Sequence, residues 1–147
     1  MMKLKLAACV LGATLLAPLA VQADNHKHSG EKALIMLNSD SLMTQGMAMV
    51  LGNAMQGQGV QVDVLLCDAA ADLALQDTTS ELLKPNDVTP EQLMMRLQQN
   101  GATVSVCALY LPNSGNTQEA LREGVEVAAP PAMAEKMMEE NTRVFTF

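Results

Sequence analysis

The chain has 147 residues, of which 16 are acidic and 9 are Lys or Arg, so its formal net charge is −7. Such an acidic chain, with few basic residues and no basic cluster, is not expected to bind nucleic acid or anionic lipid, because both need patches of Lys and Arg. Aromatic residues make up 2% of the chain and Trp is absent, so aliphatic and methionine side chains must fill the core.

Residues 1–23 are predicted to be a secretory signal peptide. Residues 1–5 carry two lysines, an apolar run covers 6–21, and the sequence VQA at 21–23 fits the small-x-small rule for cleavage before Asp24. The apolar run is too short for a retained membrane span, so we expect a periplasmic protein without membrane attachment after cleavage. The remaining 124 residues carry 7 Lys or Arg against 16 acidic residues, a net charge of −9, and suffice for one domain.

Residues 24–31, DNHKHSGE, are predicted to form a flexible polar arm. After cleavage the chain would begin with Asp24, Asn25 and His26. A free amine, two deprotonated amides and the imidazole of the third residue offer the square of nitrogen atoms that Cu(II) and Ni(II) favour. The arm is therefore a candidate copper or nickel site, and the alternative is an ordinary polar arm without a metal.

From Lys32 onward, strand patterns alternate with helix patterns. The expected strands cover residues 32–37, 60–67, 103–107, 125–128 and 143–147, and the expected helices cover 43–57, 69–75, 90–100, 120–121 and 130–138. Residues 77–88 and 112–116 are expected to be irregular. Thr89 and Gln92 form a capping box, and Asp68 is the expected cap of the helix after the second strand. This alternation predicts one α/β domain over residues 32–147, with three α/β/α layers and a mainly parallel five-stranded sheet.

Ten of the 12 methionines remain after cleavage, and in an exported protein their thioethers are candidate ligands for Cu(I). Met43, Met47, Met94 and Met137 fall at helical positions that the periodicity assigns to the core. Methionine is a flexible core filler, and this chain has few aromatic residues for that purpose. We therefore interpret these methionines as core side chains rather than as a copper site.

Two cysteines remain in the mature chain, because Cys9 leaves with the signal peptide. Cys67 ends the second expected strand and Cys107 ends the third, and in an open α/β sheet reactive groups gather beyond the carboxyl ends of the strands. If these strands are neighbours, the two cysteines can come close enough for a disulfide, which an oxidising compartment permits. The alternative is that each cysteine is a small buried apolar side chain.

The residues around Cys107 in the sequence do not activate its thiol. Val106, Ala108 and Leu109 are apolar, both histidines lie in the N-terminal arm, and the nearest downstream cation is Arg122. The sequence offers no Cys-His-Asn or Ser-His-Asp set without that arm, no C-x-x-C pair and no glycine-rich phosphate loop. These features favour a carrier or binding thiol over an enzyme with rapid turnover.

Four blocks between residues 32 and 147 resemble the DsrE/DsrF-like (YchN-type) sulfur-relay family. The blocks are KALIMLNSD, GVQVDVLLC, LMMRLQQNGATVSVC and LREGVEVAAPPAMAEKMMEENTRVFTF. The resemblance implies a five-stranded α/β/α domain, assembly as a homotrimer or homohexamer, and transfer of sulfane sulfur as a cysteine persulfide. The residue that matches the carrier cysteine is Cys107. The predicted export is a departure from the cytoplasmic members of the family.

The leading hypothesis is an exported protein that carries sulfane sulfur on Cys107. Cys67 is the candidate resolving thiol, and small-molecule or protein thiols are the expected donors and acceptors. Two alternatives belong to other classes. One is a non-catalytic periplasmic binding module that holds copper or nickel through the arm, and the other is an oligomeric structural protein whose cysteines only fill the core.

Overall fold

The computed structural model describes residue 28 and residues 30–147. The predicted signal peptide and the candidate metal ligands Asp24, Asn25 and His26 lie outside the described residues. The strands are β1 (Lys32–Leu37), β2 (Gln61–Leu66), β3 (Thr103–Val106), β4 (Val125–Val127) and β5 (Thr142–Thr146). The α-helices are α1 (Leu42–Gly57), α2 (Pro90–Gln99), α3 (Tyr110–Ser114) and α4 (Pro130–Met138), and the 3₁₀ helices are η1 (Asp68–Ala74) and η2 (Gln118–Ala120). Within the described chain, no helix is both long and apolar enough to cross a membrane.

The five strands form one sheet in the order β4-β3-β2-β1-β5, and every neighbouring pair is parallel. The chain places β2, β3 and β4 in turn on one side of β1, then returns through α4 to place β5 on the other side. The alternation of residues 143–147 predicts an edge strand, and β5 is one. The predicted α/β class with a parallel five-stranded sheet is confirmed.

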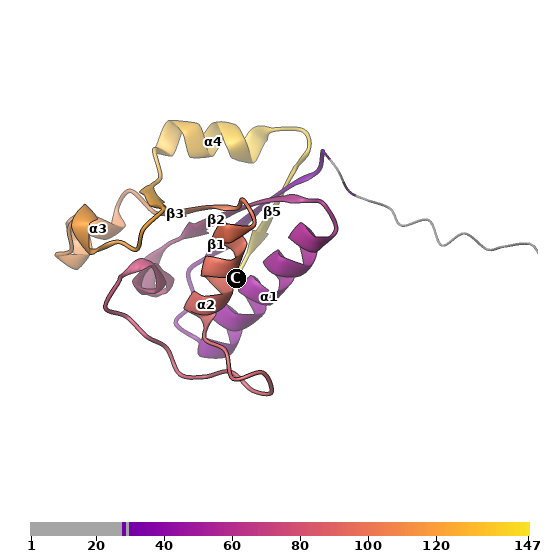
Figure 1. The fold of residues 1–147 in the computed structure, drawn as a ribbon. Coiled ribbons are helices and arrows are strands. Elements are labelled where there is room, and N and C mark those ends of the chain that lie inside the picture. The colour runs from indigo at the N-terminus through magenta and orange to yellow at the C-terminus, as the bar shows by residue number, and fades with distance from the viewer. Residues whose placement is uncertain (1–27, 29) are drawn as a thin grey trace, which may run out of the picture.

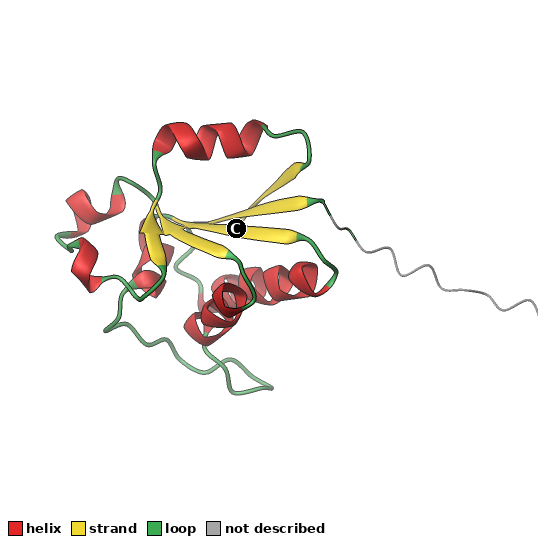
Figure 2. Cartoon of the chain, turned by 45° about the horizontal axis from the view of Figure 1, so that its top comes forward, coloured by secondary structure: helices red, strands yellow, loops and turns green. Residues whose placement is uncertain are grey.

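Helices cover both faces of the sheet (Figures 1 and 2). α1 and α2 lie side by side against one face, and α4 lies against the opposite face. α3 and η1 lie beyond the carboxyl ends of the strands, beside the end of β3. The molecule therefore has the three α/β/α layers that the sequence predicts.

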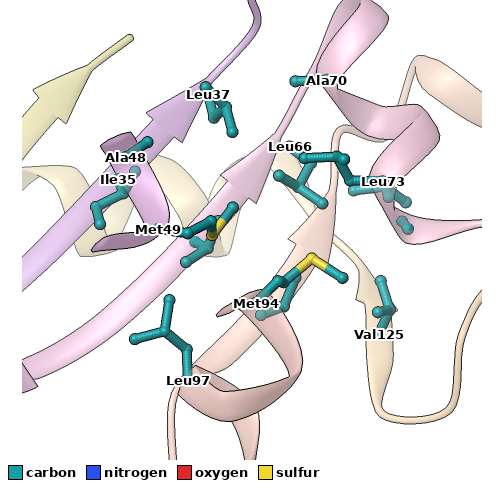
Figure 3. Packing of buried hydrophobic residues seen from close by; sticks show 14 of the residues in the cluster. Ile35, Leu37, Ala48, Met49, Leu66, Ala70, Leu73, Met94, Leu97 and Val125 are labelled. Atoms are coloured by element: carbon teal, nitrogen blue, oxygen red, sulfur yellow. The ribbon is translucent and has the colours of Figure 1, made fainter. Parts of the chain in front are cut away.

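The larger apolar core lies between the sheet and the layer formed by α1 and α2 (Figure 3). Its fully buried members include Ile35, Leu37, Met49, Val62, Val64, Leu66, Met94, Leu97, Val104 and Val106. Burying one large aliphatic side chain stabilises a fold by about 1.5–3 kcal/mol, so this layer provides most of the apolar stabilisation. The cluster on the α4 face is much smaller, with Leu34, Leu65 and Ala128 as its buried members.

The orientation of α1 differs from the sequence-based expectation. Met43 is 77% exposed and Met47 is 54% exposed, and Met137 on α4 is exposed as well. Of the four methionines assigned to the core, only Met94 is buried, so the prediction for the other three is wrong. α1 has apolar residues on all sides and no charged residue, so periodicity alone does not identify its buried face.

Small residues make up much of the buried face of α1, together with Met49 and Gln45. Ala48 and Gly52 are buried there, and a Cβ atom added to Gly52 would lie 3.0 Å from Ile35 Cδ1 and 3.1 Å from Leu97 Cδ1. A side chain at this position would push Ile35 and Leu97 away by a few tenths of an ångström, so glycine favours the close approach of α1 to β1 and α2. Met43 and Met47 face outward because the contact with the sheet is made by the opposite side of α1, where Met49 is buried among the small residues.

Two segments that follow Cys67 and Cys107 also differ from the sequence-based expectation. Pro112, predicted to start a loop, is the third residue of α3, where a missing N–H costs no helical hydrogen bond. Asp68 does not cap η1: Cys67 occupies the N-cap position, and Asp68 is the first helical residue with a φ of 50°. Aspartate tolerates this left-handed conformation better than most residues, so the chain can turn sharply directly after Cys67. The capping box of Thr89 and Gln92 is present as predicted.

Candidate functional site

The two cysteines of the described chain meet at the carboxyl end of the sheet. β2 and β3 are neighbours whose register pairs Leu66 with Val106, so Cys67 and Cys107 follow at equivalent positions. The Cys107 N–H donates to the Leu66 carbonyl at 2.8 Å, and the Cys67 N–H donates to the Leu37 carbonyl at 2.9 Å. The two backbones are therefore held side by side beyond neighbouring strands, and both side chains are free thiols.

Cys67 belongs to the face of the sheet that α4 covers. It is half-buried and packs against the small cluster that contains Leu34 and Leu65. Burial is the largest of the causes that together raise the pKa of the Cys67 thiol from 9.0 to about 12; a hydrogen bond with the Cys107 side chain and the negative charges of Cys107 and Asp68 are the others. Cys67 is therefore protonated at neutral pH, where it is a poor nucleophile.

Cys107 lines a pocket of about 510 Å³ between η1 and α3. The lining residues are Asp68, Ala69, Asp72, Cys107, Leu109, Tyr110, Asn113 and Ser114. This volume is within the range of small-molecule sites. Leu109 is 70% exposed and gives the pocket an apolar wall that is open to solvent. Cys107 thus combines a fixed backbone with access to molecules that enter the pocket.

A hydrogen bond between Tyr110 and Asp72 joins the two walls of this pocket. The Tyr110 hydroxyl donates to Asp72 Oδ1 at 2.5 Å, across 38 positions of sequence. Burial is the largest of the causes that together raise the pKa of Tyr110 from 10.0 to about 12; the hydrogen bond to the Asp72 carboxylate and the charge of that carboxylate are the others. Tyr110 is therefore neutral at physiological pH and holds α3 against η1, which fixes the shape of the pocket around Cys107.

The sequence predicts the positions of both thiols but not the walls of the pocket. Asp72 and Tyr110 come together only through the fold, and the two aspartates that closely follow Cys67 are the sequence feature that points to an acidic wall. Arg122, the nearest cation downstream of Cys107, does not line this pocket. Its guanidinium donates to backbone carbonyls of residues 73 and 78 instead.

The described part of the chain contains no group of three or more His, Cys, Asp or Glu side chains that could hold a metal ion. The copper or nickel site of the N-terminal arm falls on Asp24, Asn25 and His26, which are outside the described residues, so it stays a prediction. The site has the groups needed for thiol exchange. Cys107 offers an accessible sulfur and Cys67 a protonated sulfur beside it, and the pocket can hold the molecule that donates or accepts the exchanged group.

The parallel sheet, its strand order and its two helical layers define an α/β protein with the DsrE-like fold. Two solved structures share this fold. The YchN protein from E. coli matches with a TM-score of 0.65 and 20% sequence identity, over 80% of this chain and 99% of that chain. A protein of unknown function from Methanobacterium thermoautotrophicum, MTH1491, matches with a TM-score of 0.59 and 14% identity, over 80% of this chain and 99% of that one.

No family model matches the sequence, and no curated protein matches it. At 20% and 14% identity, the structural likeness establishes the fold, which is the YchN-type fold that the sequence blocks imply. The likeness does not extend to an activity.

Proposed function

We propose that this protein carries sulfane sulfur on Cys107, with Cys67 as the resolving thiol. The proposal depends on one observation: two unlike thiols stand at the ends of neighbouring strands. Cys107 lines a pocket that small molecules can enter, and Cys67 beside it is packed under α4 and protonated at neutral pH. The carrier and the resolving group are therefore distinguished by their surroundings rather than by their sequence context.

Loading is a thiol exchange in which no electrons enter or leave the protein. The Cys107 thiolate attacks the outer sulfur of a donor persulfide, the Cys107 Sγ–S bond forms, the sulfur–sulfur bond of the donor breaks, and the donor leaves as a thiolate. Cys107 then carries a persulfide. An acceptor thiolate that attacks the outer sulfur reverses these steps and removes the sulfur, which restores the Cys107 thiol.

Resolution by Cys67 releases the sulfur as hydrosulfide. The Cys67 sulfur attacks Cys107 Sγ, the Cys67–Cys107 disulfide forms, and hydrosulfide leaves, so two thiols are oxidised while one sulfane sulfur is reduced. Because the pKa of Cys67 is raised to about 12, its thiolate is scarce at neutral pH and this release is slow. A slow resolving thiol suits a carrier, which must hold its sulfur until an acceptor arrives.

The same proposal places the protein in the periplasm, because residues 1–23 have the pattern of a cleaved signal peptide. The periplasm is an oxidising compartment in which a neighbouring pair of thiols can be trapped as a disulfide. A carrier at this location therefore needs thiol partners that keep Cys107 reduced. Small-molecule and protein thiols are the donors and acceptors that fit this requirement.

We also propose that the protein forms a homotrimer or homohexamer through the outward face of α1. Met43, Met47, Val50 and Leu51 are exposed on this helix, which contains no charged residue. The occupant of this face is a second copy of the chain. Contact between copies of a mature chain with a net charge of −9 is least repulsive where no carboxylate is present, and α1 provides such a surface.

The decisive test measures persulfide formation on the mature chain. Thiosulfate or polysulfide with a sulfurtransferase serves as the donor. The assay contains about 1 M salt, because a Debye length of about 3 Å screens the repulsion between the acidic protein and these anionic donors. We expect a mass increase of about 32 Da on the peptide that contains Cys107, as for a persulfide. The adduct should be absent from Cys107→Ser and should persist longer in Cys67→Ser, which lacks the resolving sulfur.

Two results contradict the proposal. In the first, Cys107 reacts with iodoacetamide in the folded protein but never acquires sulfane sulfur, which leaves an accessible thiol without the carrier function. In the second, Cys107 reacts neither with the sulfur donor nor with iodoacetamide, which shows that it is a packed side chain. Circular dichroism of both serine variants establishes that the fold is kept.

A further inference from the structure

Both charged side chains in the wall of the Cys107 pocket are acidic. Asp68 and Asp72 come from η1, and both are exposed. The residues that α3 contributes are uncharged: Tyr110, Asn113 and Ser114, and Tyr110 stays neutral because its pKa is raised to about 12. Among the described residues that line this pocket, none is basic, so its field is negative.

The negative surface continues beyond this pocket. A neighbouring hollow of about 430 Å³ shares Ala69 and Asp72 with it and is also lined by Asp40 and Glu81. No described basic residue lines either hollow, and the Arg122 guanidinium reaches the second one only through the carbonyls of Leu73 and Thr78. Three lysines pair with carboxylates outside the pocket, Lys32 with Glu139, Lys84 with Asp87 and Lys136 with Asp63. A molecule that enters the Cys107 pocket therefore meets the carboxylates of Asp68 and Asp72 without a described cation in the pocket wall.

We infer that the Cys107 pocket selects its sulfur compounds by charge, accepting neutral and positively charged thiols, disulfides and persulfides and excluding anionic ones. The inference rests on the proposed function for its biological meaning, because it names the class of donor and acceptor that this site uses. Protonated aminothiols and their persulfides fit the pocket. Free thiosulfate, hydrosulfide and polysulfide are anions, so they reach the thiol slowly unless a protein delivers the sulfur.

The physical reason is Coulomb repulsion at short range in a partly enclosed space. A carboxylate near a reacting group stabilises an approaching cation and destabilises an approaching anion even in a watery environment, so each one shifts the ratio of the two rates by about a few fold. The two aspartates act on the approaching reagent from the same wall. The effect of the exposed carboxylates must weaken as salt screens them, since the Debye length falls from about 30 Å at 0.01 M to about 3 Å at 1 M.

Thiosulfonate reagents measure this selectivity without any sulfane sulfur chemistry. The Cys107 thiolate attacks the sulfenyl sulfur of a methanethiosulfonate, a mixed disulfide forms, and methanesulfinate leaves. The cationic trimethylammonioethyl and the anionic sulfonatoethyl reagents are compared in a Cys67→Ala background, which prevents exchange with the second thiol. Each rate is divided by the rate of the same reagent with a free thiol in solution, so that intrinsic reactivity cancels.

At low salt we expect the normalised rate of the cationic reagent to exceed that of the anionic reagent by about tenfold or more, and the ratio to approach one in about 1 M salt. Asp68→Asn and Asp72→Asn should each lower the low-salt ratio about threefold. Asparagine also tolerates the left-handed backbone of residue 68, and it keeps an oxygen that can accept the Tyr110 hydroxyl. Both replacements therefore preserve the shape of the pocket.

Glu123→Gln is the matched control, because it changes the net charge by the same amount but belongs to a different hollow, lined by Gln98 and Arg122. It should leave the ratio unchanged. A ratio near one at low salt, an equal response to all three replacements, or a thiol that no reagent reaches would each overturn the inference. A charge-dependent ratio combined with the absence of a persulfide adduct would uphold the selectivity and reject the carrier function, so the two failures are distinct.

Discussion

The two faces of the sheet are stabilised in different ways. On one face, α1 and α2 enclose a large core in which side chains such as Leu97 have no exposed surface. On the other, no residue of α4 is buried, and the cluster beneath it is built around Leu34 and Leu65. An ion pair connects α4 to the sheet on this thin face: Lys136 Nζ lies 2.9 Å from Oδ2 of the buried Asp63.

The difference between the two faces suggests that one face determines the stability of the fold and the other determines how well Cys67 is protected. The thick face has enough apolar contact to hold the sheet together, whereas the thin face contains Cys67 among its packed residues. A change on the thick face should therefore act on the whole molecule. A change on the thin face should act first on α4 and on the protection of Cys67.

The largest effect is expected for Leu97→Ala. Leu97 is fully buried in α2, where this helix packs against Gly52 of α1 in the larger core. We expect the free energy of unfolding to fall by about 3 kcal/mol, as for other leucine-to-alanine changes in cores. Urea unfolding followed by circular dichroism measures it.

Met133→Ala is the matched change on the thin face. Met133 is half-buried against the small cluster, so its truncation should cost about 1 kcal/mol. Equal losses of unfolding free energy for Leu97→Ala and Met133→Ala would show that the two faces of the sheet contribute alike to stability, which would contradict the difference proposed here.

Lys136→Met comes next and acts on the ion pair. It leaves the Asp63 carboxylate buried without its cation, while Asp63 Oδ1 already has no hydrogen-bond partner among the described residues. Removing one partner of a fully buried pair costs about 3–5 kcal/mol, and the partial exposure of Lys136 reduces this to about 2 kcal/mol. Unfolding in urea gives the loss, and faster alkylation of Cys67 would show that α4 has loosened.

The double variant Asp63→Leu with Lys136→Met separates charge from packing. It removes both charges and fills the space with apolar groups, so most of the lost stability should return. If the double variant is as unstable as Lys136→Met alone, the ion pair does not explain how α4 is held.

Much of the fold can be predicted from the sequence because local patterns and tertiary structure agree. The apolar run at 32–37 and the capping box at Thr89 give a strand and a helix start within a residue of those observed. The positions of Cys67 and Cys107 at strand ends follow from the same patterns. Their adjacency depends on the order of strands in the sheet, which periodicity does not encode.

The sequence-based prediction fails where contacts between distant segments determine which side chains are buried or which residues meet. Met43 and Met47 match the helical period of a core stripe, yet Gly52 and its small neighbours let the opposite side of α1 approach the sheet. The acidic wall of the site is another example, because Asp72 becomes part of a thiol pocket only when η1 and α3 meet. Neither relation is visible within one window of sequence.

A smaller effect concerns the carboxyl end of the sheet, where Tyr110 donates to Asp72. The raised pKa of Tyr110, about 12 against an ordinary 10, means that the folded state holds the phenol proton more tightly than the unfolded state. This contribution to stability is complete below about pH 10 and is lost as the pH rises toward 12. The absorbance of tyrosinate reports on this group alone, because the chain has one Tyr and no Trp.

Asp72→Asn should lower the pKa of Tyr110 without removing it from its buried position, since the charge disappears while an acceptor oxygen remains. Tyr110→Phe should eliminate the absorbance change and cost about 1 kcal/mol for the lost hydrogen bond. A midpoint near 10 in the folded wild type, equal to that in urea, would show that Tyr110 does not lock the pocket.

The smallest effect on the stability of a single chain is expected for Met43→Lys combined with Met47→Lys. Both side chains are largely exposed on the outer side of the thick face, so the core beneath them is unchanged and the fold should be kept. If this surface joins copies of the chain, lysines on each copy would place like charges in the contact, and the homotrimer or homohexamer should dissociate.

Light scattering at micromolar concentration measures the mass of the assembly. Met138→Lys, on α4 and 83% exposed, is the control and should leave the mass of the assembly unchanged. A monomeric wild type would contradict the proposed assembly, and an assembly that survives the double replacement would place its interface away from α1, so that the methionine surface would need another explanation.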